Sequence, residues 1–142
     1  MKYLLLLALL SLPLQAATTA TLVLQGHVPK ILNLVVTPTS TASNLDLSTS
    51  QTNVNVASVS VLSNSSVGYN LTFSSANSGV LSNGSATIPY TLKLDSTNVT
   101  LNSPLSYSNF GTTVRQMYIS YVASSPNDGT YTDTITITLT SN

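Results

Sequence analysis

The sequence predicts an all-β protein, an antiparallel β-sandwich of immunoglobulin-like type. Short segments in which apolar and polar residues alternate recur along the chain, and no segment after the N-terminal leader carries a convincing helical period. Turn-forming residues separate these segments at short spacing, and the composition is rich in Val, Leu, Ile, Thr and Tyr. The chain has no cysteine, so the core has to stabilise the fold without disulfides.

The first 16 residues are predicted to be a secretory signal peptide. Lys2 precedes an apolar run over residues 4–10, and Ala16 and Ala17 supply small residues at the expected cleavage site. That run is too short to span a bilayer, and no later apolar stretch approaches a membrane span. Removal of residues 1–16 leaves about 126 of the 142 residues as an exported chain, the size of one domain.

An apolar comb follows the signal peptide, within an N-terminal extension assigned to residues 17–29 and ahead of a sandwich domain assigned to residues 30–142. Side chains alternate along an extended strand, so every second residue of the comb shares one face. A free apolar strand at a terminus is what a protein needs to complete the sheet of a neighbour. The residues of this face are Leu22, Leu24, Gly26 and Val28.

The first strand of the domain is predicted over residues 31–36. This run is almost continuously apolar and is ended by Pro38, which favours a strand buried on both faces. A Ser/Thr loop is expected over residues 37–43, followed by a short element over residues 44–48 that carries Leu45 and Leu47. In residues 54–62 the apolar phase shifts between Val56 and Ala57, which predicts a β-bulge.

The middle of the chain has the cleanest alternation. Turns are predicted at residues 77–79 and at Asn83-Gly84, the second as a tight hairpin. Pro89 cannot donate to a ladder, so its nitrogen should face away from a partner strand. The alternating apolar residues are Val67, Tyr69, Leu71 and Phe73 in one strand, and Ile88, Tyr90, Leu92 and Leu94 in the next.

The last third of the chain is expected to hold a short strand near Val99, a loop with Pro104 and a strand over residues 114–122. Residues 126–129 read Pro-Asn-Asp-Gly, which predicts a turn. The final strand is placed over residues 131–140, where Ile135, Ile137 and Leu139 alternate with threonines.

The charged and catalytic side chains are too few for most kinds of site. After residue 16 the chain holds three cationic and four anionic side chains, which argues against a nucleic-acid partner. One histidine, His27, and scattered aspartates supply neither a catalytic group nor a metal site, so we expect no enzyme activity, cofactor or metal. Asp128 is interpreted as a turn former and Asp133 as a charge on a strand face.

The tyrosines allow two interpretations. Tyr69 and Tyr90 lie in the apolar phase of their strands and are expected in the core. Tyr107, Tyr118 and Tyr121 could line a sugar-binding face, or they could be strand residues whose polar tips reach the surface. The second interpretation is favoured.

The two ends of the chain together resemble chaperone–usher pilus subunits. The pattern Leu22-x-Leu24-x-Gly26-x-Val28 is similar to the N-terminal extension of these subunits. The last strand, from Gly129 to Leu139, is similar to that of the archaic branch, which includes the spore-coat-U-like proteins. The segment over residues 68–75 also fits this branch, so the resemblance spans the mature chain.

The resemblance implies an immunoglobulin-like sandwich that lacks its final strand and receives a donor strand from the next subunit. It implies partners: other copies or sister pilus subunits, a periplasmic chaperone and an outer-membrane usher, with export to the cell surface. The chain departs from many members in having no disulfide, and its Thr-Ser-Asn end lacks the aromatic residue that classical members use in chaperone binding. The implied acceptor-groove residues are Ile135, Ile137 and Leu139, and the implied donor residues are Leu22, Leu24, Gly26 and Val28.

The leading hypothesis is therefore a structural subunit of a bacterial surface fibre that polymerises by donor-strand exchange. The alternative is a secreted, self-complete β-sandwich that binds carbohydrate or an envelope surface, with its N-terminal strand folded back into its own sheet. A third hypothesis is an envelope or matrix protein without strand exchange.

Overall fold

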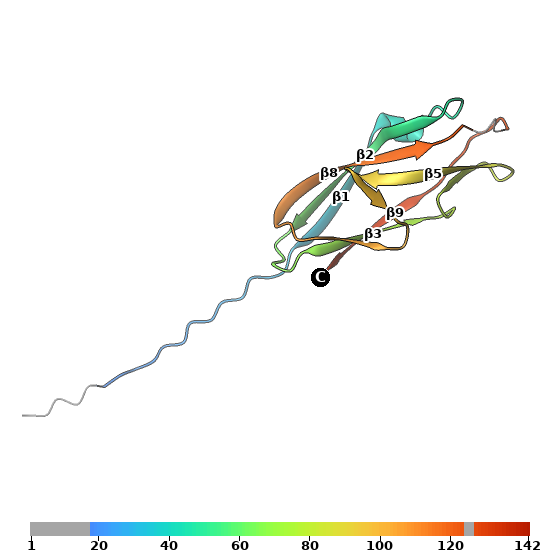
Figure 1. Ribbon diagram of the computed structural model, residues 1–142. Coiled ribbons are helices and arrows are strands. Elements are labelled where there is room, and N and C mark those ends of the chain that lie inside the picture. Colours follow the sequence, from blue (N-terminus) through green and yellow to red (C-terminus); the bar gives the residue numbers. More distant parts are fainter. Residues whose placement is uncertain (1–17, 124–126) are drawn as a thin grey trace, which may run out of the picture.

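The computed structural model describes residues 18–123 and 127–142, and it confirms an all-β sandwich of antiparallel strands (Figure 1). The predicted signal peptide, and Pro126 of the predicted turn, lie outside the described residues. The strands are β1 (Leu32–Pro38), β2 (Gln51–Ser63), β3 (Tyr69–Ser75), β4 (Val80–Ser82), β5 (Thr87–Leu94), β6 (Thr97–Val99), β7 (Pro104–Tyr107), β8 (Gly111–Tyr121) and β9 (Ile135–Ser141).

Two sheets form the layers of the sandwich. The larger sheet has the order β1-β2-β8-β5-β4, with β6 pairing the remaining part of β5, and the smaller sheet has the order β7-β3-β9. Every strand pair is antiparallel. The chain therefore crosses between layers several times, and β1 and β9 end up as edge strands of different sheets.

The alternating segments supply the core, as predicted. The three inward residues of β3 and the four of β5 are all buried, while their polar neighbours face outward. Val67 is the exception, because β3 begins only at Tyr69 and Val67 is 60% exposed in the preceding turn. The buried residues of these two strands are Tyr69, Leu71, Phe73, Ile88, Tyr90, Leu92 and Leu94.

The predicted bulge in β2 is confirmed. The register of β2 against β8 shifts between Asn55 and Ala57, and the consecutive residues Val56 and Ala57 are both buried. A second shift lies between Gln51 and Val54. The extra residue of the bulge shifts by one position the set of residues that point inward. The apolar residues on both sides of the bulge therefore face the core.

The first strand differs from the prediction of burial on both faces. Among the described residues β1 pairs with β2 alone, so it is an edge strand, and its outward residue Val35 is 50% exposed. The reason is topological: the sandwich has two layers, so the outer face of β1 has no third layer to cover it. The strand itself continues to Pro38, which pairs with Ala57 at the end of the ladder.

The segment that follows β1 also differs. A 3₁₀ turn (Ser40–Ser43) occupies the predicted loop, and residues 44–48 form no strand. The Asp46 carboxylate instead accepts hydrogen bonds from Ser48 and Thr49, which lower the pKa of Asp46 and close a local turn in place of a ladder. Leu45 and Leu47 still pack against the core.

The remaining boundaries shift modestly. The β4–β5 hairpin forms with residues 83–86 as its loop, and Asn83 caps that loop by accepting from the Ala86 N–H. The Tyr90 N–H donates to Gly79 on the β4 side, so the Pro89 nitrogen points to the other edge, where pairing with β8 begins only at Tyr90. Pro104 starts strand β7 rather than lying in a loop, and β9 begins at Ile135, four residues later than predicted.

Candidate functional site

One open side of the sandwich lies between β1, at one edge of the larger sheet, and β9, at one edge of the smaller sheet. Within the described part of the chain, β1 pairs with β2 alone and β9 with β3 alone. Each strand therefore presents one edge of backbone N–H and C=O groups without a ladder partner. Such an edge is a template for one more strand.

The two strands run in opposite directions along this opening. At one end, the residues flanking Leu32 and Ser141 are both tied to the β2–β3 loop: Asn64 donates to the Ile31 carbonyl, and Asn142 donates to the Gly68 carbonyl. At the other end, Val36 and Pro38 of β1 line the same cavity as Ile135 of β9. β1 and β9 therefore lie close to each other with opposite directions, with Leu32 and Ser141 at one end of the opening and Pro38 and Ile135 at the other.

The inner faces of both strands are apolar but only partly covered. The ladder places Val36 beside Val59 and Ile137 beside Phe73, and both of these neighbours have no exposed surface. Val36 itself remains 41% exposed. We call this space the β1–β9 groove, and its walls are Leu32, Leu34, Val36, Ile135, Ile137 and Leu139, all incompletely buried.

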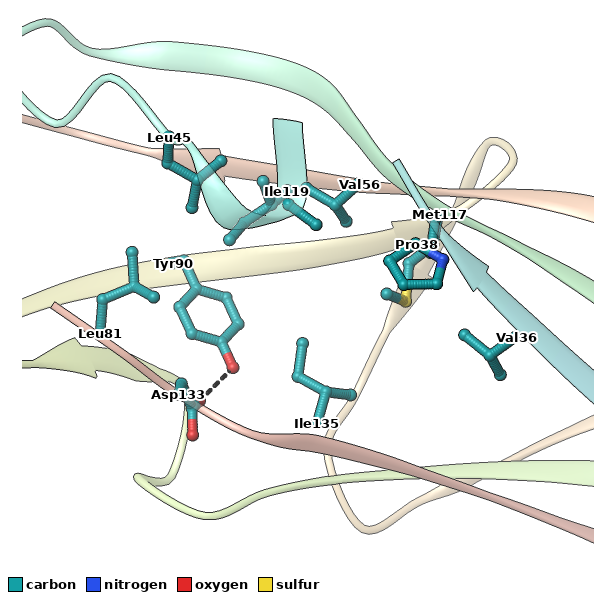
Figure 2. Close-up of a pocket in the computed structure, with 12 residues that line it drawn as sticks. Val36, Pro38, Leu45, Val56, Leu81, Tyr90, Met117, Ile119, Asp133 and Ile135 are labelled. Atoms are coloured by element: carbon teal, nitrogen blue, oxygen red, sulfur yellow. Dashed lines mark hydrogen bonds between the residues drawn. The ribbon is translucent and has the colours of Figure 1, made fainter. Parts of the chain in front are cut away.

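A cavity of about 260 Å³ lies at the Pro38 end of the groove. Figure 2 shows its mostly apolar lining, with Ile135 and Val36 beside it and the Tyr90 ring pointing across it toward Asp133. Met117, Ile119 and Leu81 are further lining residues. An aliphatic side chain placed there would meet apolar atoms on most sides.

Asp133 fastens the start of β9 to both sheets. Its carboxylate accepts hydrogen bonds from the Ser75 hydroxyl at 2.6 Å, from the Tyr90 hydroxyl and from the backbone N–H groups of Asn77 at 3.0 Å and Thr134 at 2.7 Å. Ser75 ends β3 and Tyr90 belongs to β5 of the other sheet. Asp133 is thus a link between the layers rather than the strand-face charge that was expected.

The ionisation of this pair follows from its surroundings. Burial, and then the hydrogen bond to the Asp133 carboxylate, raise the pKa of Tyr90 to about 12. Burial alone would raise the pKa of Asp133, but the hydrogen bonds from Ser75, Tyr90, Asn77 and Thr134 together lower it. At neutral pH the link is a carboxylate that accepts from a protonated phenol.

The predicted donor residues lie outside the sandwich. Residues 18–30 form no strand or helix and are exposed, and they run away from the domain as an extended segment (Figure 1). Leu22, Leu24 and Val28 are 80%, 86% and 79% exposed, and a Cβ added at Gly26 would meet nothing within 4 Å. The structure therefore does not bring the donor residues and the groove of one molecule together, and their roles stay predictions.

The five weighed tyrosines separate into core and surface. Tyr69 and Tyr90 are buried as predicted, and Tyr121 is buried as well, donating from its hydroxyl to the Asp46 carbonyl at 2.8 Å. Tyr107 faces inward against Tyr69, and Tyr118 faces outward opposite Lys93. The three residues considered for a sugar-binding face therefore share no common face.

The other titratable residues are dispersed. His27 lies in the exposed extension, and Asp95 forms an ion pair with Arg115 at 3.1 Å. In residues 18–123 and 127–142 no group of three or more His, Cys, Asp or Glu side chains could hold a metal ion. Over the same residues the structure contains no helix with the length and apolarity needed to cross a membrane.

Sequence reasoning missed Asp133 as a link and Asn64, whose side chain contacts the base of the extension. Both residues act on partners more than 30 positions away in the sequence, which alternation cannot identify. Comparison with known proteins adds no assignment: no protein-family model matches the chain, and no curated protein matches its sequence.

Proposed function

We propose that the protein is a structural subunit of a bacterial surface fibre, joined to its neighbours by donor-strand exchange. The observation that carries this proposal is the coexistence, in one chain, of an unfilled apolar groove and an exposed apolar strand. An edge strand with exposed apolar walls invites aggregation unless another strand covers it. The N-terminal extension of a second copy has the chemistry to do so.

The apolar residues of the extension and those of β9 have the same spacing along the chain. Leu22, Leu24 and Val28 recur at multiples of two residues, as do Ile135, Ile137 and Leu139 on the groove wall. Two strands with the same period can place their apolar side chains on one face in register. A donor strand antiparallel to β9 would put Leu22 near the Leu139 end and Val28 near the cavity.

This orientation also gives a linear assembly. The donor's own sandwich would follow Val28 and therefore sit beyond the Pro38 end of the acceptor. The acceptor's extension leaves from the opposite end, beside Leu32. Each copy would then use two different surfaces at its two ends, and such head-to-tail contacts that do not close produce filaments.

Burial of the donor side chains supplies the stabilisation. Three large aliphatic side chains contribute roughly 5–9 kcal/mol when they leave water. The backbone hydrogen bonds along β9 add roughly 1 kcal/mol each, and ordering the extension opposes both. The net binding free energy of such complexes appears mainly as a low dissociation rate.

The proposal includes partners that act before assembly. A groove this apolar needs cover during export, and the resemblance to chaperone–usher subunits assigns that role to a periplasmic chaperone, with an outer-membrane usher releasing the chain to the surface. Whether the subunit belongs to the shaft or to a minor position does not affect the joining mechanism.

The test uses two neighbouring substitutions in the extension. Leu24→Asp places a charge on the groove-facing side of the donor strand, and Val23→Asp places the same charge on the opposite side. We expect unheated gel ladders of wild-type protein and of Val23→Asp, and their loss in Leu24→Asp. Equal ladders from both variants, or a wild-type chain that stays monomeric and binds glycans, would favour the self-complete binding module instead.

A further inference from the structure

Asn64, the first residue after β2, holds the base of the N-terminal extension. Its side-chain Oδ1 accepts a hydrogen bond from the Ile31 N–H at 2.7 Å, and its Nδ2 donates to the Pro29 carbonyl at 2.8 Å. Its backbone N–H also donates to the Ile31 carbonyl at 3.2 Å. We call these three bonds the Asn64 clamp, and together they fix residues 29–31.

The clamp prolongs the β1–β2 ladder beyond its last regular pair, Leu32 and Ser63. Pro29 has no N–H, so a backbone ladder cannot continue through it in the ordinary way. A side-chain amide carries both a donor and an acceptor, and Asn64 uses one on each side of Lys30. The extension therefore lies in line with β1 and points away from the two sheets (Figure 1).

The loop that carries Asn64 is itself tied to the smaller sheet. Gly68 has a φ of +87°, and a Cβ there would lie 2.0 Å from the Tyr107 carbonyl oxygen of β7. The backbone and side chain of Asn142, beyond β9, donate to Gly68 and Val67 at 3.3 Å and 3.0 Å. The clamp thus lies on a loop whose other end packs against β7 and is hydrogen-bonded to Asn142.

The nearest competitor for the groove is the molecule's own extension. The groove begins beside Leu32, where the extension leaves, so a reversal at residues 29–31 would lay the chain's own apolar comb along β1. A tethered strand has an effective concentration in the millimolar range, far above that of separate copies in dilute solution. This reversal requires a turn at residues 29–31, and these are the residues that Asn64 holds in line with β1.

We propose that the Asn64 clamp keeps each copy's donor strand out of its own groove and so leaves it free for a second copy. Asn64 is a positioning residue, because its hydrogen bonds hold the base of the extension at Pro29 and Ile31. The purpose assigned to the clamp rests on the proposed function, but its effect on the extension can be measured without polymer.

The experiment measures the direction of the extension within one molecule. The chain has no cysteine, so Thr21→Cys and Ser40→Cys introduce two spin labels at exposed positions. A reversal centred near Lys30 would bring the labels within about 15 Å, whereas an outward extension keeps them beyond about 30 Å at strand spacing. Monomers separated by gel filtration are frozen and their label distances recorded.

In the wild-type background we expect the long distances to dominate. Asn64→Ala removes both side-chain bonds and should raise the short-distance population roughly tenfold. Asn64→Asp keeps the acceptor for the Ile31 N–H and loses the donor to Pro29, so it should raise that population less. Asn70→Ala is the matched control. It removes a side-chain amide in β3 of the smaller sheet, whose Oδ1 accepts a hydrogen bond from the Ser106 hydroxyl at 2.6 Å, and it should leave the label distances unchanged.

Identical distance distributions in wild type and Asn64→Ala, with both folded by circular dichroism, would overturn the clamp. A dominant short distance in wild type would overturn it as well. Failure of the proposed function looks different, because outward-pointing wild-type monomers would then never form polymers at any concentration.

Discussion

Strands β5 and β9 both alternate apolar and polar residues, but they differ in the number of strands that flank them. In β5 the inward residues Ile88 and Leu92 are 0% and 3% exposed, whereas the inward residues of β9 are all only partly buried. The cause is position: β5 has neighbours on both sides in its sheet, and β9 has one neighbour within the described residues. Alternation thus marks which face of a strand is apolar, and incomplete burial of that face marks a strand at the edge of its sheet.

The largest expected effect contrasts Ile88→Ala with Ile137→Ala in the monomer. Ile88 is fully enclosed, so its truncation leaves a cavity and should lower the free energy of unfolding by about 3–4 kcal/mol. Ile137 is only partly buried and should lose less, about 2 kcal/mol, because part of its surface already meets water. Urea unfolding of isolated monomers measures both.

The Ile88→Ala and Ile137→Ala variants can also be compared in the polymer. If a donor strand covers Ile137, Ile137→Ala should speed the dissociation of polymers far more than it destabilises the monomer. Equal losses for the two variants in the monomer would show that the groove is closed without a partner.

A second prediction concerns Asp133, which holds the start of β9. Asp133→Asn puts an NH₂ group among donors that need an acceptor, and it should cost roughly 2 kcal/mol of stability. Hydrogen exchange should speed in β9 and leave β5 little changed, because β5 keeps its ladders. Uniform acceleration through both strands would contradict a local role for Asp133.

The acid dependence of this link has a definite sign. The folded-state pKa of Asp133 lies below its ordinary value of 3.8, so the carboxylate stabilises the fold above that value. This contribution is lost as the pH falls from about 3.8 through the folded-state pKa. The wild-type free energy of unfolding should therefore fall more steeply in acid than that of Asp133→Asn.

The smallest expected effect is alkaline and involves Tyr90. Its pKa is raised from 10.0 to about 12 in the folded state, so its stabilisation is complete below pH 10 and is lost as the pH rises toward 12. Tyr90→Phe should lose about 1 kcal/mol at neutral pH and show a shallower decline between those values. Other tyrosines titrate in both proteins, so the difference between the two stability curves is the measured quantity.

The alternation of apolar and polar residues predicted most of the strands, but it predicted little of how the strands are arranged in the two sheets. The burial of Tyr69, Leu71 and Phe73 and the bulge at Val56 followed from alternation, which depends on adjacent residues. The exposed outer face of β1 did not, because its apolar run does not reveal that only one other sheet packs against the strand. The number of layers depends on how distant segments pair and pack.

The candidate site shows the same division. The apolar comb and the alternation of β9 were visible in the sequence, but the groove between β1 and β9 is a product of topology. Asn64 and Asp133 contact partners 33 and 58 residues away, Ile31 and Ser75. A lone Asn or Asp in a chain so rich in polar residues carries no local sign of such contacts.

Intermolecular cross-linking can detect directly whether the extension of one copy lies beside β9 of another. Copies with Gln25→Cys, on the outer face of the extension, are mixed with size-tagged copies that carry Thr136→Cys, Thr138→Cys or Thr140→Cys on the outer face of β9. Donor-strand exchange predicts a disulfide between two different copies for at least one of these pairs, and its loss when Leu24→Asp is added. No disulfide between copies for any of the three pairs, together with an internal disulfide in a second preparation whose chains carry both cysteines, would show that each molecule completes itself and would overturn donor-strand exchange.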